Sequence, residues 1–207
     1  MSNKLSIARH AMQPPFNRQA PSRPGVPLDD DDEFPFHHES RREIAVSPEI
    51  LFSYLDDHNR LSGHMSKSSW MMAGSRMDIE FDAEKGQAIG SRIRLKGRAL
   101  GVPLYVEEVV TERTPPLRKA WQTVGAPRLL VTGPYRMGFE IIPKGAASQL
   151  RIFIDYALPS TRSLRWLGGI LGRFYANWCA EKMAGDAAQA FATQPDSRSF
   201  TQQGQRS

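Results

Sequence analysis

The sequence predicts an α+β fold in which a curved antiparallel sheet of six or seven strands wraps around one long C-terminal helix. Apolar and polar residues alternate in strand-like runs through the middle of the chain, from about Ser40 to Leu158. Parallel neighbours would need a helical crossover, and none separates the later strands, so the sheet is predicted to be antiparallel. A long amphipathic stretch, Ser163 to Phe191, follows the last strand. This arrangement leaves room for a ligand between sheet and helix.

Two short helices are expected directly after the first strand, which should run from Ser40 to Val46. The Ser-Pro-Glu run at 47–49 begins the first helix, because serine is favoured as N-cap, proline at the first helical position and an acid in the first turn. Asp56 or Asp57 then caps a second short helix toward Leu61. We expect these two helices to close one side of the sheet.

The next two strands carry complementary charges. Met77 to Asp82 alternates apolar with acidic residues, and Arg92 to Ala99 alternates apolar with basic residues. Opposite charges on facing positions favour pairing, so these strands should be antiparallel neighbours. The remaining strands are expected at Val102–Thr111, Arg118–Val124, Leu129–Ile142 and Leu150–Leu158.

The last helix has a bulky apolar stripe at steps of three or four residues, made by Leu164, Leu167, Leu171, Phe174 and Trp178. Such a stripe is expected to pack on the sheet. Gly168, Gly169 and Gly172 lie among these residues, either because the helix starts late or because something packs tightly there, with space for a ligand as the functional alternative. Cys179 is interpreted as a small buried hydrophobic residue.

The composition fits one domain with two tails. The chain has 207 residues, of which 40% are hydrophobic and 24% charged. We expect a domain at 39–192 between a disordered proline-rich tail at 1–38 and a disordered polar tail at 193–207. One cysteine allows no intrachain disulfide, which favours a reducing compartment, and no signal peptide or membrane span is recognised, so a cytoplasmic location is expected.

The net charge of +5 suggests an anionic partner. The charge is not clustered and no nucleic-acid-binding motif is present, so nucleic acid is not expected. Arg162, Arg165 and Arg173 lie beside large apolar residues of the last helix, an arrangement that suits transient contact with an anionic membrane surface. An ordinary core helix explains the same pattern and is the favoured interpretation.

Two segments carry a family resemblance. The run Ile44 to Leu55 (IAVSPEILFSYL) resembles the opening of the START/Bet v1-like (SRPBCC) superfamily, and Glu108 to Pro116 (EVVTERTPP) resembles a recurring strand end in its polyketide cyclase/dehydrase-like branch. The resemblance covers about 40–191 and implies the helix-grip fold, with a cavity between sheet and last helix. Members bind lipids, sterols, quinones or polyketides, and a minority are cyclases or dehydratases.

We therefore expect a carrier or sensor that binds a hydrophobic small molecule such as a lipid, quinone or polyketide, without a cofactor. Tyr135 offers a hydroxyl that could orient a polar group of the ligand, although core packing is the favoured explanation for a tyrosine there. The residues expected to line the cavity are Trp70, Ile93, Leu95, Trp121, Tyr135, Met137, Phe139, Tyr156, Leu171, Phe174, Tyr175 and Trp178.

The alternative function is a cyclase or dehydratase with an acid or base in the cavity, for which Asp155, Glu108 and His64 are the candidates. Asp155 should pair with Arg136 on the outer face, unless the two faces of the sheet are reversed. His58 or His64 could act as an acid or base at the cavity mouth. The histidines do not fall at metal-ligand spacing, so no metal site is expected.

Overall fold

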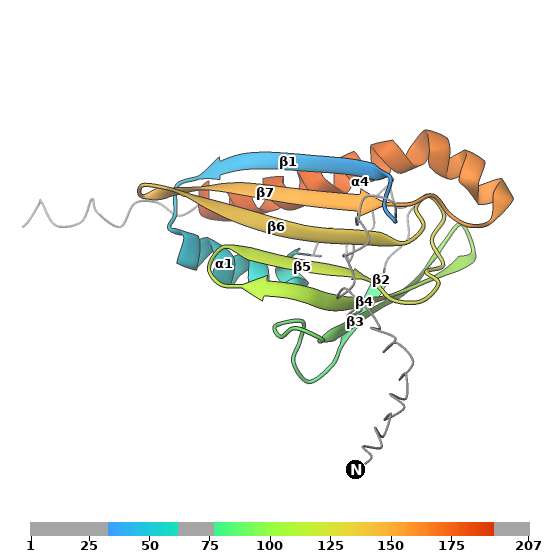
Figure 1. Ribbon diagram of the computed structural model, residues 1–207, viewed down its shortest axis with the longest axis horizontal. Coiled ribbons are helices and arrows are strands. Elements are labelled where there is room, and N and C mark those ends of the chain that lie inside the picture. The colour runs from blue at the N-terminus through green and yellow to red at the C-terminus, as the bar shows by residue number, and fades with distance from the viewer. Residues whose placement is uncertain (1–32, 62–76, 193–207) are drawn as a thin grey trace, which may run out of the picture.

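The computed structural model (Figure 1) describes residues 33–61 and 77–192. Its elements follow the predicted order of one strand, two short helices, six strands and one long helix. They are β1 (Phe36–Ile44), α1 (Pro48–Asp56), α2 (His58–Leu61), β2 (Met77–Phe81), β3 (Arg92–Ala99), β4 (Val102–Thr114), β5 (Arg118–Thr123), β6 (Tyr135–Lys144), β7 (Ala147–Tyr156) and α4 (Arg162–Ala192).

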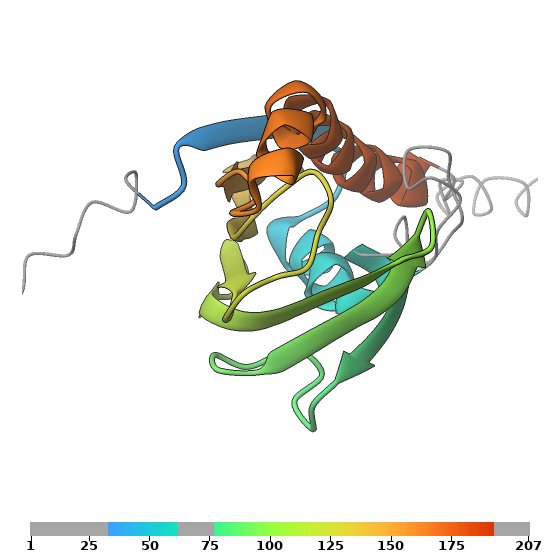
Figure 2. The same cartoon turned by 90° about the vertical axis from the view of Figure 1, so that its right-hand side faces the viewer.

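The seven strands form one antiparallel sheet in the order β1-β7-β6-β5-β4-β3-β2. The first strand therefore lies beside the last, while β2 forms the far edge. The sheet curls around α4, which lies across β1 and β7, and α1 lies on the same concave side (Figures 1 and 2). This is the predicted fold class, and the strand count is at the upper of the two predicted values.

Both predicted helix starts are confirmed. Ser47 has an extended backbone, and Pro48 begins α1. The carboxylate of Asp57 accepts a hydrogen bond from the backbone N–H of Asn59 at 3.0 Å, which caps α2. The buried side chains of α1, among them Leu51 and Leu55, join the core. The chain between Ile44 and Leu61 is thereby fixed against the inner side of the sheet.

Charged residues cover the outer face of the sheet, as the alternation predicted. Lys96 of β3 pairs with Glu80 of β2 at 2.8 Å, and β2 and β3 are antiparallel neighbours. Arg136 faces Asp155 across β6 and β7, and their side chains lie 3.1 Å apart. The exposed pair of Lys96 and Glu80 contributes about 1 kcal/mol or less. These pairs show which face of each strand points away from the core.

The prediction for the last helix was wrong about which face packs. Leu171 and Phe174 of the predicted stripe are 42% and 66% exposed. The face that lies against the sheet consists of small residues, Gly168, Gly172, Ala176, Ala180, Ala184 and Ala187. The helix begins at Arg162, so its glycines are not outside a late helix start.

Close approach of the backbone explains the small residues. A Cβ atom at Gly168 would lie 2.7 Å from Pro159 Cδ and 2.8 Å from the carbonyl oxygen of Val131. A Cβ atom at Gly172 would lie 2.9 Å from the same carbonyl oxygen. The space that the glycines leave is therefore filled by the chain itself and not by a ligand. Bulky side chains of α4 can only lie on its sides or its outer surface.

Some boundaries differ from those predicted. β6 begins at Tyr135 and not at Leu129, and the segment before it crosses the end of the sheet as a loop (Figure 2). β1 begins at Phe36, inside the segment predicted as a tail. The rest of the predicted tails lies outside the described residues, and their disorder stays a prediction.

Candidate ligand-binding site

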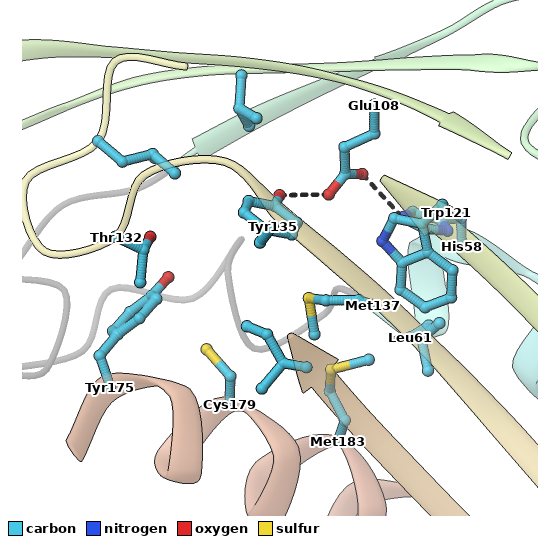
Figure 3. A pocket seen from close by; sticks show the side chains of 13 residues that line it. His58, Leu61, Glu108, Trp121, Thr132, Tyr135, Met137, Tyr175, Cys179 and Met183 are labelled. Atoms are coloured by element: carbon cyan, nitrogen blue, oxygen red, sulfur yellow. Dashed lines mark hydrogen bonds and ion pairs between the residues drawn. The ribbon is translucent and has the colours of Figure 1, made fainter. Parts of the chain in front are cut away.

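A cavity lies between the inner face of the sheet and α4, with α2 at one side (Figure 3). Its walls come from α2, from β4 to β7, from the loop before β6 and from α4. The lining side chains are His58, Leu61, Val106, Glu108, Trp121, Leu129, Thr132, Tyr135, Met137, Ile154, Tyr175, Cys179 and Met183. Most of them are apolar; among the polar ones, Glu108 and His58 lie on one side and Thr132 and Tyr175 on the other (Figure 3).

The cavity is small. The space open to the centres of water-sized molecules is about 40 Å³. One water needs roughly 10–15 Å³ by this measure, so there is room for about three. Met137 and Met183 line the cavity with flexible, unbranched side chains that adapt readily to a neighbour's shape. A larger ligand can therefore be accommodated only if these side chains move.

Glu108 is the central polar residue of the site. In β4 the inward positions alternate, and Glu108 takes the place between Val106 and Val110, where it is 3% exposed. Glu107 points outward and binds Arg92 at 3.0 Å. Of these two adjacent glutamates, Glu107 therefore lies on the outer face of the sheet, and Glu108 places a carboxyl group in the core.

Two side chains approach Glu108 from different elements (Figure 3). The hydroxyl of Tyr135, from β6, donates a hydrogen bond to Oε1 of Glu108. Nε2 of His58, from α2, lies 3.6 Å from Oε2, a distance that forms an ion pair when the imidazole is protonated. Oε2 itself accepts no hydrogen bond from any described residue. One acceptor at the cavity wall therefore has unused hydrogen-bonding capacity.

The surroundings of the Glu108 carboxyl group are buried and aromatic. His58 is 3% exposed and meets the ring of Trp121 edge-on, with 5.0 Å between centroids. Burial, and then the neighbouring Glu108, raise the pKa of Tyr135 well above its usual value. The Tyr135 hydroxyl therefore stays protonated and acts as a hydrogen-bond donor. In so apolar a setting each polar contact has more influence than it would in water.

The helix side of the cavity contributes Tyr175 and Cys179. Burial raises the pKa of the Cys179 thiol to about 12, and Tyr175, its hydrogen-bonding neighbour one turn away, opposes that shift only in part. Burial also raises the pKa of Tyr175 well above its usual value. The thiol is therefore protonated at neutral pH, which makes it a packing residue and not a nucleophile.

The cavity contains six of the residues singled out from the sequence, namely Glu108, Trp121, Tyr135, Met137, Tyr175 and, expected at the mouth, His58. Four others are buried in the core away from the cavity lining, namely Ile93, Leu95, Phe139 and Tyr156. They share the inner face of the sheet but lie at positions that the cavity does not reach.

The other candidates lie elsewhere. Leu171 and Phe174 are exposed on α4, and Trp178 is half-buried outside the lining. Asp155 is on the outer face, where Arg136 and His37 bind it, so it is not a cavity acid. Residues His64 and Trp70 lie outside the described residues.

Seven lining residues were not predicted from the sequence to line the cavity, namely Leu61, Val106, Leu129, Thr132, Ile154, Cys179 and Met183. Strand alternation could have predicted Val106 and Ile154, because each lies on the apolar side of its strand. No such pattern could have predicted Leu129 and Thr132, because they belong to a loop. His58 begins α2, and only the packing of that helix brings it to Glu108.

The described residues include no group of three or more His, Cys, Asp or Glu side chains arranged to hold a metal ion. Within the same ranges, none of the helices is both long and apolar enough to cross a bilayer.

Comparison with known proteins identifies the fold. No family model matches the chain, and no curated protein matches its sequence. Among solved structures, norcoclaurine synthase from Thalictrum flavum superposes with a TM-score of 0.55 at 13% identity, over 93% of this chain and 100% of that one.

Two bacterial structures agree with it. The Zhui aromatase/cyclase from a Streptomyces species gives a TM-score of 0.51 at 14% identity, over 73% of this chain and 93% of that one. The protein TTHA0849 from Thermus thermophilus gives 0.52 at 16% identity, over 75% and 99%. At such low sequence identity, structural similarity indicates the fold and not the activity. With its seven-stranded curved sheet and long C-terminal helix, the chain has the helix-grip fold, which these solved structures share.

Proposed function

We propose that the protein binds a small, largely hydrophobic molecule in the cavity between sheet and α4, as a carrier or sensor, and that Glu108 receives a hydrogen bond from the ligand's polar group. The observation that carries this proposal is the buried Oε2 of Glu108, which accepts no hydrogen bond from the described residues although it lies at the cavity wall. Leaving a buried polar atom unsatisfied costs about 1–3 kcal/mol. A ligand hydroxyl or amine at this point would remove that cost.

The shape of the cavity restricts the ligand further. Glu108, Tyr135 and His58 form one polar group in its wall, and most of the remaining wall is apolar, with side chains such as Val106 and Met183. A ligand with one donor group and a compact apolar body matches this division. Among the classes expected from the sequence, a phenolic polyketide or a reduced quinone fits better than a long acyl chain, because it combines a hydroxyl donor with a compact apolar body.

The direct test combines native mass spectrometry of freshly purified protein with solvent extraction of bound molecules. The wild type is expected to carry a reproducible extra mass. Glu108→Gln keeps the side-chain volume but replaces an acceptor oxygen by a donor, so occupancy should fall by about 10- to 100-fold, the effect of losing a hydrogen bond to a charged group.

Glu107→Gln is the matched control, because it makes the same change on the outer face one residue away and should leave occupancy unchanged. The proposal fails if the wild type carries no extra mass and takes up no small phenol or quinol. Equal occupancy in the two variants would also contradict it.

A second function, acid–base catalysis of a cyclase or dehydratase type, is favoured by the convergence of Glu108, Tyr135 and His58 in a water-poor cavity. The carboxyl group could remove a proton while the tyrosine hydroxyl donates to a carbonyl oxygen. Incubating the extracted molecule with ligand-free protein separates the two functions. A carrier returns the same mass, whereas an enzyme produces a new mass that Glu108→Gln does not produce.

A further inference from the structure

The N-terminal half of α4 presents large apolar side chains to solvent. Trp166, Ile170, Leu171 and Phe174 are 72%, 48%, 42% and 66% exposed. Three of them follow one another at steps of four residues, so they form a continuous strip along the helix. We call these four residues the α4 apolar face. Soluble monomers seldom expose so large a contiguous apolar surface unless it has a binding function.

Packing within the domain does not require this face. The opposite side of α4, with its glycines and alanines, makes the contact with the sheet. Figure 1 shows the N-terminal half of α4 projecting beyond the ends of β1 and β7. The C-terminal half differs in character, because charged residues such as Glu181, Lys182 and Asp186 accompany it. The apolar face is thus confined to the projecting part of the helix.

The charge around the face has one sign. Between Ala157 and Ala180 the only charged residues are Arg162, Arg165 and Arg173, all of them exposed. No acidic residue occurs in that stretch. Three arginines beside a tryptophan and a phenylalanine complement a surface that is apolar inside and anionic outside, which describes a bilayer with acidic headgroups.

A second apolar element lies at the same end of the molecule. Leu100, in the turn between β3 and β4, is 79% exposed and has a φ of 51°. Leucine is unfavourable in this left-handed conformation, which glycine or asparagine ordinarily takes in a turn. Val102 beside it is 45% exposed. Figure 1 places this turn and the start of α4 at one end of the fold, and Figure 2, which looks onto that end, shows them on different sides of it.

This end also adjoins the cavity. Tyr175 lines the cavity and directly follows Phe174 in the helix. Leu129 and Thr132, in the loop that crosses this end of the sheet, line it as well. A protein that docks through the α4 apolar face would therefore hold its cavity close to the surface on which it docks.

We propose that the α4 apolar face, its three arginines and the β3–β4 turn together form a docking surface for an anionic membrane. Trp166 and Phe174 enter the boundary between headgroups and acyl chains, and the arginines bind lipid phosphates. A second copy of the chain is a poorer occupant, because a two-fold contact would bring two sets of arginines together without an acidic partner from this segment. The surface does not depend on what the cavity binds.

Vesicle flotation with the full chain tests the proposal. The protein should float with equimolar phosphatidylcholine and phosphatidylglycerol vesicles and much less with phosphatidylcholine alone. Replacing the three arginines by glutamine should lower binding to the anionic vesicles by about fivefold for each arginine. Trp166→Ser with Phe174→Ser should lower it by at least about tenfold, because two apolar anchors are lost.

The control variant, Ile142→Ser with Lys144→Gln, removes a half-exposed apolar residue and a cation from the opposite end of the sheet and should float like the wild type. Circular dichroism confirms that each variant is folded, and Trp166→Ser alone serves if the double variant is not. Absence of the wild type from the anionic vesicles, or equal flotation of all variants, would overturn the proposal. So would a wild-type dimer by light scattering that Phe174→Ser converts to a monomer.

Discussion

At the scale of single residues, the polar chemistry of the cavity depends on one glutamate at a position where its strand otherwise has valine. Glu108 takes the inward direction because β4 alternates, and its neighbours Val106 and Val110 fix that alternation. Tyr135 and His58 then meet it from β6 and α2. A carboxyl group in such surroundings stabilises the fold little by itself, so its presence is better explained by a ligand than by packing.

Cys179 allows a test at the same scale. Burial raises the pKa of its thiol from 9.0 to about 12, so the reactive thiolate is about a thousandfold rarer than in an unfolded chain. Iodoacetamide at pH 8 should therefore modify the native protein at least about a thousandfold more slowly than the protein in urea. The chain has one cysteine, so the mass shift reports this site alone. Comparable rates in the two states would show that the helix side of the cavity is open.

At the scale of elements, close backbone packing, and not the size of the side chains, decides which face of α4 lies against the rest of the domain. A helix normally turns its largest apolar residues toward the core, yet α4 turns Gly168 and Gly172 there because the backbone of Val131 lies against it. Trp166, Ile170, Leu171 and Phe174 are left on the outer surface. The spacing of apolar residues located the helix but did not decide which side of it would pack.

The glycines of α4 provide the element-scale test. Alanine favours a helix over glycine by about 1 kcal/mol. Gly169→Ala should therefore stabilise the protein by up to that amount, because nothing lies within 4 Å of a Cβ atom there. Gly168→Ala should destabilise it by about 1 kcal/mol or more, because the new methyl meets a backbone oxygen and a proline ring. Urea unfolding measures both, and stabilisation by both substitutions would contradict the close approach of α4.

At the scale of the whole molecule, ion pairs connect neighbouring strands across the outer face of the sheet. Glu39 of β1 binds Arg151 of β7 at 2.6 Å, and Arg151 binds Glu140 of β6 at 2.8 Å. The pKa of Glu39 is lowered from 4.5 to about 2, and the hydrogen bond from Arg151 is the largest cause. These contacts connect the first strand to the last two.

The pH dependence of stability follows from this shift. The pKa of Glu39 is lower in the folded than in the unfolded chain, so its contribution is complete above about pH 4.5 and is lost as the pH falls toward 2. The free energy of unfolding should decline in this window, and less steeply in Glu39→Gln. Glu80→Gln, which removes an exposed pair with Lys96, is the control and should retain the wild-type slope. Identical slopes for wild type and Glu39→Gln would contradict the role of the pair.

Local patterns predicted much of this architecture. The alternation in Met77–Phe81 and Arg92–Ala99, the proline at the start of α1 and the Asp57 cap each depend on residues near in sequence. The site was predicted only in part. Tyr135, Met137 and Trp121 followed from strand alternation, while residues from loops and short helices did not, because no periodicity governs their direction.

The sequence by itself therefore determined the order of the elements, the antiparallel sheet and its charged outer face, because all of these follow from short-range periodicity and capping. The tertiary structure decided which side of α4 packs and which residues meet in the cavity. Glu108 and Tyr135 are 27 positions apart, and His58 comes from another element again. Their meeting depends on how the sheet curves around the helix, and that curvature is a property of the packed whole and not of any one segment.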